Sequence, residues 1–188
     1  MARITRRELM NILGAFGLVA VLAGLALGLP AVDRAFSAER PLQAGVPVDI
    51  GAGVTVVPPA GATLDVTGTR PGGSMGSAFF RLGAVQYKIS VRPFDGDLET
   101  AAARLRQRIT GNQGYQVTSA QLAVDTVDGL AGLQGGYTAP GRGGRYAVFV
   151  GDGRTIEILI SGNDLDLGAT LPQIEASTRT LRIDGTAR

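Results

Sequence analysis

The sequence contains no cysteine, no histidine and no tryptophan, and Lys88 is its only lysine. Without cysteine the chain can form neither a disulfide nor a thiolate nucleophile, and it cannot carry a lipid on an N-terminal cysteine. Without histidine it lacks the commonest general base near neutral pH and every imidazole metal ligand. Ser-His-Asp triads and cysteine or histidine zinc sites are therefore excluded for this chain alone.

An excess of charge of one sign is also absent outside the N-terminal segment. From residue 33 onward the chain has 15 Arg plus Lys and 15 Asp plus Glu, so the net positive charge comes from the first residues. A nucleic-acid-binding protein usually shows a basic face or stripe. The balance predicts no nucleic-acid partner.

One long hydrophobic run is present near the N-terminus. Residues 9–32 carry no charge, and a helix that crosses a bilayer needs about 20 mainly apolar residues. A secretory signal has a shorter apolar region of about 7–15 residues, which favours a retained transmembrane helix over a cleaved signal. The pair Gly24 and Gly28 has G-x-x-x-G spacing, so helix pairing and a homodimer within the membrane are an alternative to glycine that is simply frequent.

The flanks of this run predict its orientation. Arg3, Arg6 and Arg7 precede it, and positive charge on that side favours a cytoplasmic N-terminus. The predicted organisation is a cytoplasmic tip at 1–8, a transmembrane helix at 9–32, a short stalk at 33–45 and an extracytoplasmic domain at 46–188. The expected location is the cell membrane, with a single pass and the C-terminal domain outside.

The outer segment shows strand patterns broken by turn residues. Val85, Tyr87, Ile89 and Val91 alternate with polar residues, which predicts a strand with one buried face and places Lys88 toward water. Asp-Gly pairs at 128–129 and 152–153 favour tight hairpins, and the string GRGGR at 141–145 is read as a further turn. The expected strands lie within residues 46–66, 78–94, 121–127, 130–138, 145–150 and 155–161.

Two helices are expected. Residues 97–112 place Leu98, Leu105 and Ile109 on one stripe, with Asp97 as the N-cap and Gly111 or Gly114 at the end. A second helix is expected to begin near Thr170, with Pro172 in its first turn, and to extend to about Arg182. The predicted fold class is α+β, an antiparallel β-sheet with helices packed on it.

Several clusters could carry a site, and each has a structural alternative. Asp95, Asp97 and Glu99 have the alternate spacing of a calcium loop, although helix capping also explains them. A second acidic cluster precedes the last helix at Asn163, Asp164 and Asp166. A third candidate is a docking patch, whose aromatic side chains core packing would otherwise bury: Phe79, Phe80, Tyr87 and Phe94. The fourth is a backbone anion site at GRGGR, with Arg142 or Arg145.

Three stretches resemble the PsbP-type α/β/α sandwich. They are GVTVVPPAG (53–61), RYAVFVGDGRTIEILISG (145–162) and the terminal STRTLRI (177–183), with one helix after a long strand pair between the first two. The likeness covers roughly residues 46–183 and is greatest to anchored, extracytoplasmic forms of high-GC bacteria. A tryptophan often follows the early glycine in such proteins, whereas this chain has Ala62. The resemblance implies a binding or assembly-assisting module and supplies no catalytic residues.

These observations predict a non-catalytic accessory module, with no cofactor, for an envelope protein complex or a cell-wall ligand. Two alternatives remain. A small-molecule or lipid carrier would need an apolar cavity between the sheet and a helix. A carboxylate-dependent hydrolase would need two converging acids, and glycosidases usually add aromatic sugar platforms.

Overall fold

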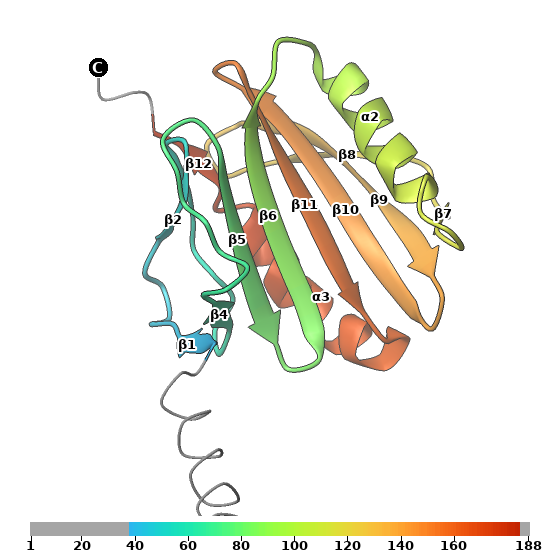
Figure 1. Ribbon diagram of the computed structural model, residues 1–188, viewed down its shortest axis with the longest axis horizontal. Coiled ribbons are helices and arrows are strands. Elements are labelled where there is room, and N and C mark those ends of the chain that lie inside the picture. The colour runs from blue at the N-terminus through green and yellow to red at the C-terminus, as the bar shows by residue number, and fades with distance from the viewer. Residues whose placement is uncertain (1–37, 185–188) are drawn as a thin grey trace, which may run out of the picture. The chain divides into compact units, whose positions relative to one another are not determined.

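The computed structural model describes residues 38–184, which are organised around a nine-stranded antiparallel sheet (Figure 1). The strand order is β1-β4-β5-β6-β11-β10-β9-β7, and β8 also pairs with β9. The strands are β1 (Glu39–Pro41), β4 (Thr63–Asp65), β5 (Gly76–Leu82), β6 (Val85–Pro93), β7 (Gln116–Val117), β8 (Leu122–Asp125), β9 (Ala131–Ala139), β10 (Arg142–Gly151) and β11 (Arg154–Gly162).

Short-range sequence signals account for the central hairpins. Asp152 and Gly153 both have positive φ, as a two-residue type I′ turn requires, and they join β10 to β11. The period-two pattern of β6 is confirmed, because Val85, Tyr87 and Ile89 are buried while Lys88 is exposed. The strands expected at 121–127, 130–138, 145–150 and 155–161 correspond to β8, β9, β10 and β11.

One face of the large sheet carries a helix and a second, smaller sheet. Helix α3 (Asp164–Thr178) packs against β6, β10 and β11. A three-stranded sheet of β2 (Val48–Gly51), β3 (Val54–Val56) and β12 (Arg182–Ile183) contributes Ile50, Val54 and Val56 to the same core. Alternate side chains of β5, β6 and β11 fill this core from the sheet.

The opposite face is covered only in part. Helix α2 (Leu98–Thr110) lies over β10, β9 and β7, and its buried stripe ends at Ile109. Its predicted N-cap is confirmed, since the Asp97 carboxylate accepts a hydrogen bond from the Thr100 amide at 2.7 Å, and Gly111 is the C-cap. Figure 1 shows that β5, β6 and β11 have no helix in front of them on this side. This open half of the sheet is where a ligand can reach the strands.

Glycines in β9 and β10 lie under aromatic rings of the neighbouring strand. Gly144 is directly opposite Tyr137, and two further pairs, Gly135 with Tyr146 and Gly132 with Phe149, repeat the arrangement. A Cβ added at any of the three glycines would come within 2.5 Å of the ring side chain opposite. The turn expected at residues 141–145 is wrong in extent, because residues 142–145 pair with β9 as part of β10. Gly144 leaves space for the Tyr137 ring, whereas Gly143 faces Asp164 of α3.

The second expected helix begins earlier than its sequence signals indicate. α3 begins at Asp164, and Asn163 is its N-cap, accepting from the Asp166 amide at 2.9 Å. Pro172 is consequently inside the helix rather than in its first turn. The helix ends at Thr178, and residues 182–183, expected to be its last turn, form β12 against β3.

Two further predictions concern the N-terminal part of the chain. Residues 39–41, within the expected stalk, form β1 and pair with β4, so the sheet already begins there. The expected transmembrane helix at 9–32, with Gly24 and Gly28, lies outside the described residues. Among residues 38–184, neither α2 nor α3 has the length and apolarity that crossing a bilayer requires.

Tyr87 connects the sheet to α3 and makes the fold sensitive to alkali. Its hydroxyl lies 3.1 Å from Thr178 Oγ1, and burial raises the pKa of Tyr87 to about 12 from 10.0. The stabilising contribution is complete below pH 10 and is lost as pH rises toward about 12, because the unfolded state ionises first. Two pKa units correspond to roughly 3 kcal/mol of unfolding free energy.

Tyr87→Phe is therefore expected to reduce the loss of stability between pH about 9 and about 11, measured by urea unfolding at each pH. Part of the loss remains, because burial also raises the pKa of Tyr137 and Tyr146. If the unfolding free energy of Tyr87→Phe fell as much between these two pH values as that of the wild type, this role of Tyr87 would be contradicted.

Candidate functional site

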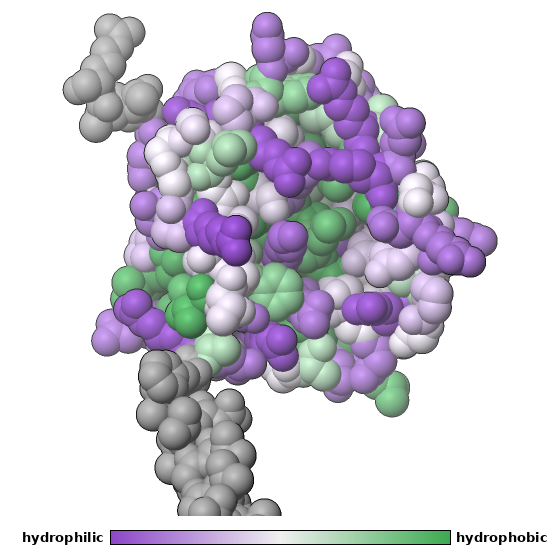
Figure 2. All heavy atoms as spheres, viewed as in Figure 1, coloured by the Kyte–Doolittle hydropathy of each residue, from purple (hydrophilic) through white to green (hydrophobic). Residues whose placement is uncertain are grey.

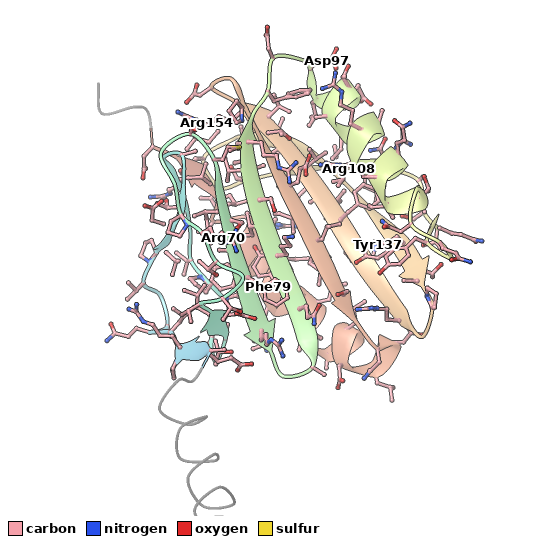
Figure 3. The ribbon with its side chains drawn as sticks, in the orientation of Figure 1. Arg70, Phe79, Asp97, Arg108, Tyr137 and Arg154 are labelled. Carbon is pink, nitrogen blue, oxygen red and sulfur yellow. The ribbon has the colours of Figure 1, made fainter. Side chains whose placement is uncertain are left out.

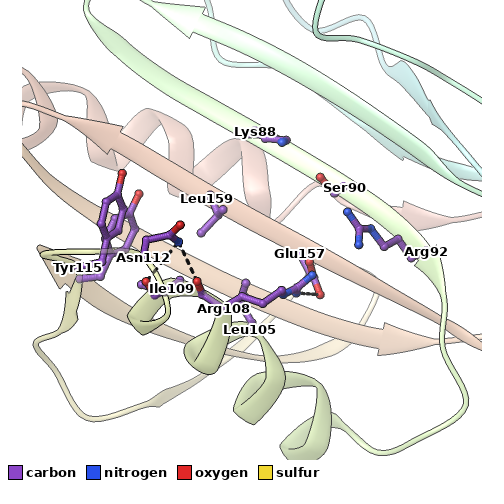
Figure 4. A pocket seen from close by; sticks show the side chains of 11 residues that line it. Lys88, Ser90, Arg92, Leu105, Arg108, Ile109, Asn112, Tyr115, Glu157 and Leu159 are labelled. Carbon is purple, nitrogen blue, oxygen red and sulfur yellow. Dashed lines mark hydrogen bonds and ion pairs between the residues drawn. The ribbon is translucent and has the colours of Figure 1, made fainter. Parts of the chain in front are cut away.

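A groove lies where α2 meets the open half of the sheet. It has a volume of about 220 Å³, and α2 forms one wall while β6 and β11 form the base and the other wall (Figure 4). Leu105, Ile109 and Leu159 supply apolar side chains, of which the first two are buried. Drug-sized ligands usually occupy about 300–1,000 Å³, so this groove suits a small ligand or one segment of a longer one.

The β6 side of the groove is polar because of strand alternation. Lys88, Ser90 and Arg92 point to the open face, opposite to the buried Ile89 and Val91. Their register places Ser90 directly opposite Glu157 of β11, with Lys88 opposite Leu159. The two cations of β6, Lys88 and Arg92, thus lie on either side of the position opposite the Glu157 carboxylate.

That carboxylate is already engaged by α2. Glu157 pairs with the guanidinium of Arg108, and its side chain is only 11% exposed whereas that of Arg108 is 46% exposed. The Asn112 amide donates to the Arg108 carbonyl at 2.8 Å and closes the end of the helix beside the groove. The ion pair joins α2 to β11 and leaves Lys88 and Arg92 as the cations available to a ligand.

The far end of the groove is aromatic. The Tyr137 ring crosses over Gly144 of β10, and its hydroxyl donates to the Ile160 carbonyl of β11 at 3.1 Å. Tyr115 stacks on it with the ring centroids 6.0 Å apart. Burial is the main cause of the raised pKa of Tyr137, followed by the nearby Tyr115. This end is fixed and presents ring surface rather than charge.

Further cations continue the groove in both directions. A neighbouring hollow of about 330 Å³ is lined by Arg92, Arg104 and Arg108, and the Arg104 guanidinium lies 5.3 Å from the centre of the Phe94 ring. On the other side of β6, a shallow depression is lined by Arg70, Lys88 and Arg92. Figure 2 shows hydrophilic side chains crossing this face around an apolar hollow, and Figure 3 places Arg70 and Arg108 on opposite sides of β6.

The arrangement favours binding of an anion with a small apolar part. The three hollows are lined by five cations, Arg70, Lys88, Arg92, Arg104 and Arg108, and by one carboxylate, Glu157. Hydrolysis by a carboxylate pair would need a second acid beside Glu157, and none of the residues that line these hollows supplies one.

The four candidate docking aromatics are not brought together on one surface. Phe80 and Tyr87 are each 1% exposed and belong to the core beneath the sheet, so they cannot dock a partner. Phe79 and Phe94 are half-buried and each lies under a guanidinium, of Arg81 and Arg104 respectively. Sequence alternation along β5 places Phe79 and Phe80 on opposite faces.

Each of the two acidic clusters contributes one helix cap, and its other members lie in or just before the first turn of that helix. Asp97 and Asn163 are the N-caps of α2 and α3. Hydrogen bonds from Thr100 lower the pKa of Asp97, as expected for a capping carboxylate. No group of three or more acidic side chains within residues 38–184 is arranged to hold a metal ion. Arg142 and Arg145 lie in β10, and Arg142 directly follows the turn at Pro140 and Gly141, so the backbone anion site stays a prediction.

The cationic groove was not predicted from the sequence. The cations of the groove and of the two neighbouring hollows are spread from residue 70 to residue 108, and from residue 33 onward the basic residues are balanced by acids. One signal was available: Lys88 and Arg92 share the wet face of the β6 alternation. Nothing local indicated that β11 and α2 would lie beside that face.

Comparison with known proteins yields the fold. Neither a protein-family model nor a curated protein matches the sequence. Cyanobacterial PsbP (CyanoP) from Synechocystis sp. PCC 6803 is 14% identical with a TM-score of 0.51, and the match covers 76% of this chain and 97% of that one. LpqN, involved in cell envelope biogenesis of Mycobacterium tuberculosis, is 13% identical with a TM-score of 0.44 over 78% and 91% of the two chains. The described part of the chain has a PsbP-like fold, an antiparallel sheet with two helices.

Proposed function

We propose that this protein is a membrane-anchored, extracytoplasmic binding module that acts without catalysis and holds an anionic ligand in the groove between α2 and β6. The observation that carries the proposal is the segregation of charge on the open half of the sheet. Five cations and a single, already paired carboxylate line the three hollows there. A cell-wall ligand or an acidic segment of an envelope protein has the matching charge.

The location expected from the sequence supports the same proposal. Residues 9–32 are uncharged and long enough to span a bilayer, and the arginines before them favour a cytoplasmic N-terminus. The sheet begins at residue 39, which leaves few residues between the proposed helix and the domain. The domain that carries the groove would then be exposed to envelope components outside the membrane.

The groove also bears on the carrier alternative. A cavity does lie between the sheet and a helix, as a carrier requires. Its volume of about 220 Å³ and its cationic side are poorly suited to enclosing a whole lipid, because burying charged groups beside acyl chains is costly. We therefore favour an anionic ligand or ligand segment over a lipid cargo.

The binding site can be tested with inorganic phosphate as a probe on the full chain in an uncharged detergent. Phosphate is expected to shift the amide NMR signals of Ser90 and Arg108, and Lys88→Gln is expected to weaken binding about tenfold through loss of a charged hydrogen bond. Arg145→Gln is the matched control, because Arg145 lines a hollow with Glu175 on the opposite side of the sheet. Equal effects of the two substitutions would reject the groove.

The anchor is tested separately. The protein is expected to stay in the membrane fraction after alkaline carbonate washing, and protease added to intact spheroplasts is expected to digest the folded domain. Mature molecules that begin beyond residue 37 and appear in the soluble fraction would contradict the anchor while leaving the groove test unaffected.

A further inference from the structure

The groove and the depression on the far side of β6 share one wall. Lys88, Ser90 and Arg92 line both the groove of about 220 Å³ and the wider depression of about 720 Å³. The depression is bounded by the loop between β4 and β5, which supplies Arg70. A polar path therefore leads from α2 across β6 to this loop, and we call its five cations, Arg70, Lys88, Arg92, Arg104 and Arg108, the cationic trough.

Most of this charge is not neutralised within the fold. Arg108 pairs with Glu157, but among residues 38–184 no carboxylate lies within ion-pair distance of the other four cations. The depression beside Arg70 is lined by three cations and no acid. A single small anion in the groove would leave Arg70 without a partner, whereas a longer anion could contact all of these cations.

The loop that carries Arg70 is held in place by the rest of the domain. The Arg70 amide donates to the Ser77 carbonyl at 2.8 Å, and Ala52 donates to the Gly72 carbonyl at 2.6 Å. The Thr69 hydroxyl accepts from the Phe79 amide at 3.0 Å. Because the loop is already ordered by these bonds, Arg70 can join a binding site with little additional ordering cost.

We propose that the cationic trough binds a linear, flexible polyanion that lies across β6 from α2 to the β4–β5 loop. This inference rests on the proposed function and names its ligand class: a chain with phosphate or carboxylate groups repeated along it. Nucleic acid would benefit from exposed aromatic platforms. Beside the trough, however, Tyr115 and Tyr137 stack on each other at one end, and the Phe94 ring lies under the Arg104 guanidinium.

The probes for the test are tripolyphosphate and long-chain inorganic polyphosphate, titrated into the full chain in an uncharged detergent. The long chain is expected to bind at least tenfold more tightly at equal phosphate concentration, and its affinity is expected to fall more steeply with added salt. Arg70→Gln is expected to weaken long-chain binding about tenfold and to leave tripolyphosphate binding within twofold. Because Arg70 is exposed, the variant is expected to fold as the wild type does, and thermal unfolding checks this.

The outcomes distinguish failure of the polyanion proposal from failure of the groove itself. If Arg70→Gln leaves long-chain affinity unchanged while Lys88→Gln weakens tripolyphosphate binding, the extension across β6 is wrong and the groove remains. If neither probe binds, both proposals are wrong. Tighter binding of a single-stranded oligonucleotide, or of phosphatidylglycerol vesicles, than of polyphosphate at equal charge would also overturn the polyanion assignment.

Discussion

Gly144→Val is expected to destabilise the domain more than any other single substitution proposed here. A Cβ at position 144 would lie 2.2 Å from Tyr137 Cζ and 2.6 Å from the Ile160 carbonyl oxygen. The first contact is with a buried ring and the second with the backbone of β11, so neither can move aside cheaply. Overpacking of this kind typically costs about 1–3 kcal/mol and occasionally more.

The displaced ring adds to that cost. Tyr137 would lose its hydrogen bond to Ile160, worth about 1 kcal/mol, together with part of its packing against α2. We expect a total of about 3–5 kcal/mol, which corresponds to a fall in Tm of about 10 °C or more for a chain of this size. The measurement is thermal or urea unfolding followed by circular dichroism.

Gly168→Ala provides the matched control. A Cβ at position 168 meets no heavy atom within 4 Å, and the residue lies in the interior of α3. Alanine is expected to stabilise the domain by up to about 1 kcal/mol, because glycine is a poor helix former. A Gly144→Val variant that unfolds within 2 °C of the wild type would show that the Tyr137 ring is not fixed over β10 as the structure has it.

Reversing two charges on β6 is expected to weaken anion binding about a hundredfold without unfolding the domain. In Lys88→Glu with Arg92→Glu, each side chain changes by two charge units beside the groove. An interaction between unit charges about 6 Å apart is worth about 0.7 kcal/mol in water, so the two reversals remove about 2.8 kcal/mol, or about a hundredfold in affinity. Both side chains are exposed, and Tm is expected to change by only a few degrees.

Two control variants give the sign of the effect. Arg145→Glu reverses a single charge on the opposite side of the sheet and is expected to leave phosphate affinity nearly unchanged. Glu157→Gln removes the one carboxylate of the groove and is expected to strengthen binding several-fold. Phosphate or tripolyphosphate titrations of the four proteins test this order. A double reversal that binds as well as the wild type would rule out β6 as the ligand-contacting strand.

Local signals in the sequence were sufficient for the elements with strong periodicity or specific turn residues. Asp97 and the stripe ending at Ile109 predicted α2 closely, and Asp152-Gly153 predicted the β10–β11 hairpin. The start of α3 was missed because Asn163 and Thr170 both offer capping chemistry, and the choice depends on where the helix packs. Leu167, before Thr170, and Leu171, after it, both lie against the core in the structure, so the helix includes both.

The pairings between distant segments could not be predicted locally. β12 joins β3, more than a hundred residues earlier in the chain, and β1 joins β4. Gly144 of β10 was expected in a turn, because the Tyr137 ring that needs its space is on the neighbouring strand β9. In each case the deciding contact is made by a residue far away in sequence or across a strand pair.

The sequence by itself determined the available chemistry and the local elements: without histidine or cysteine most catalytic centres are excluded, and period-two and helical stripes specify which side chains are buried. Only the tertiary structure decided where the charges meet. α2 covers β9 and β10 but leaves β6 and β11 open, so cations from three separate segments share one face, although their sum over the chain is cancelled by acids placed elsewhere. The physical reason is that net charge is additive along a chain, whereas the potential at a surface depends on distance.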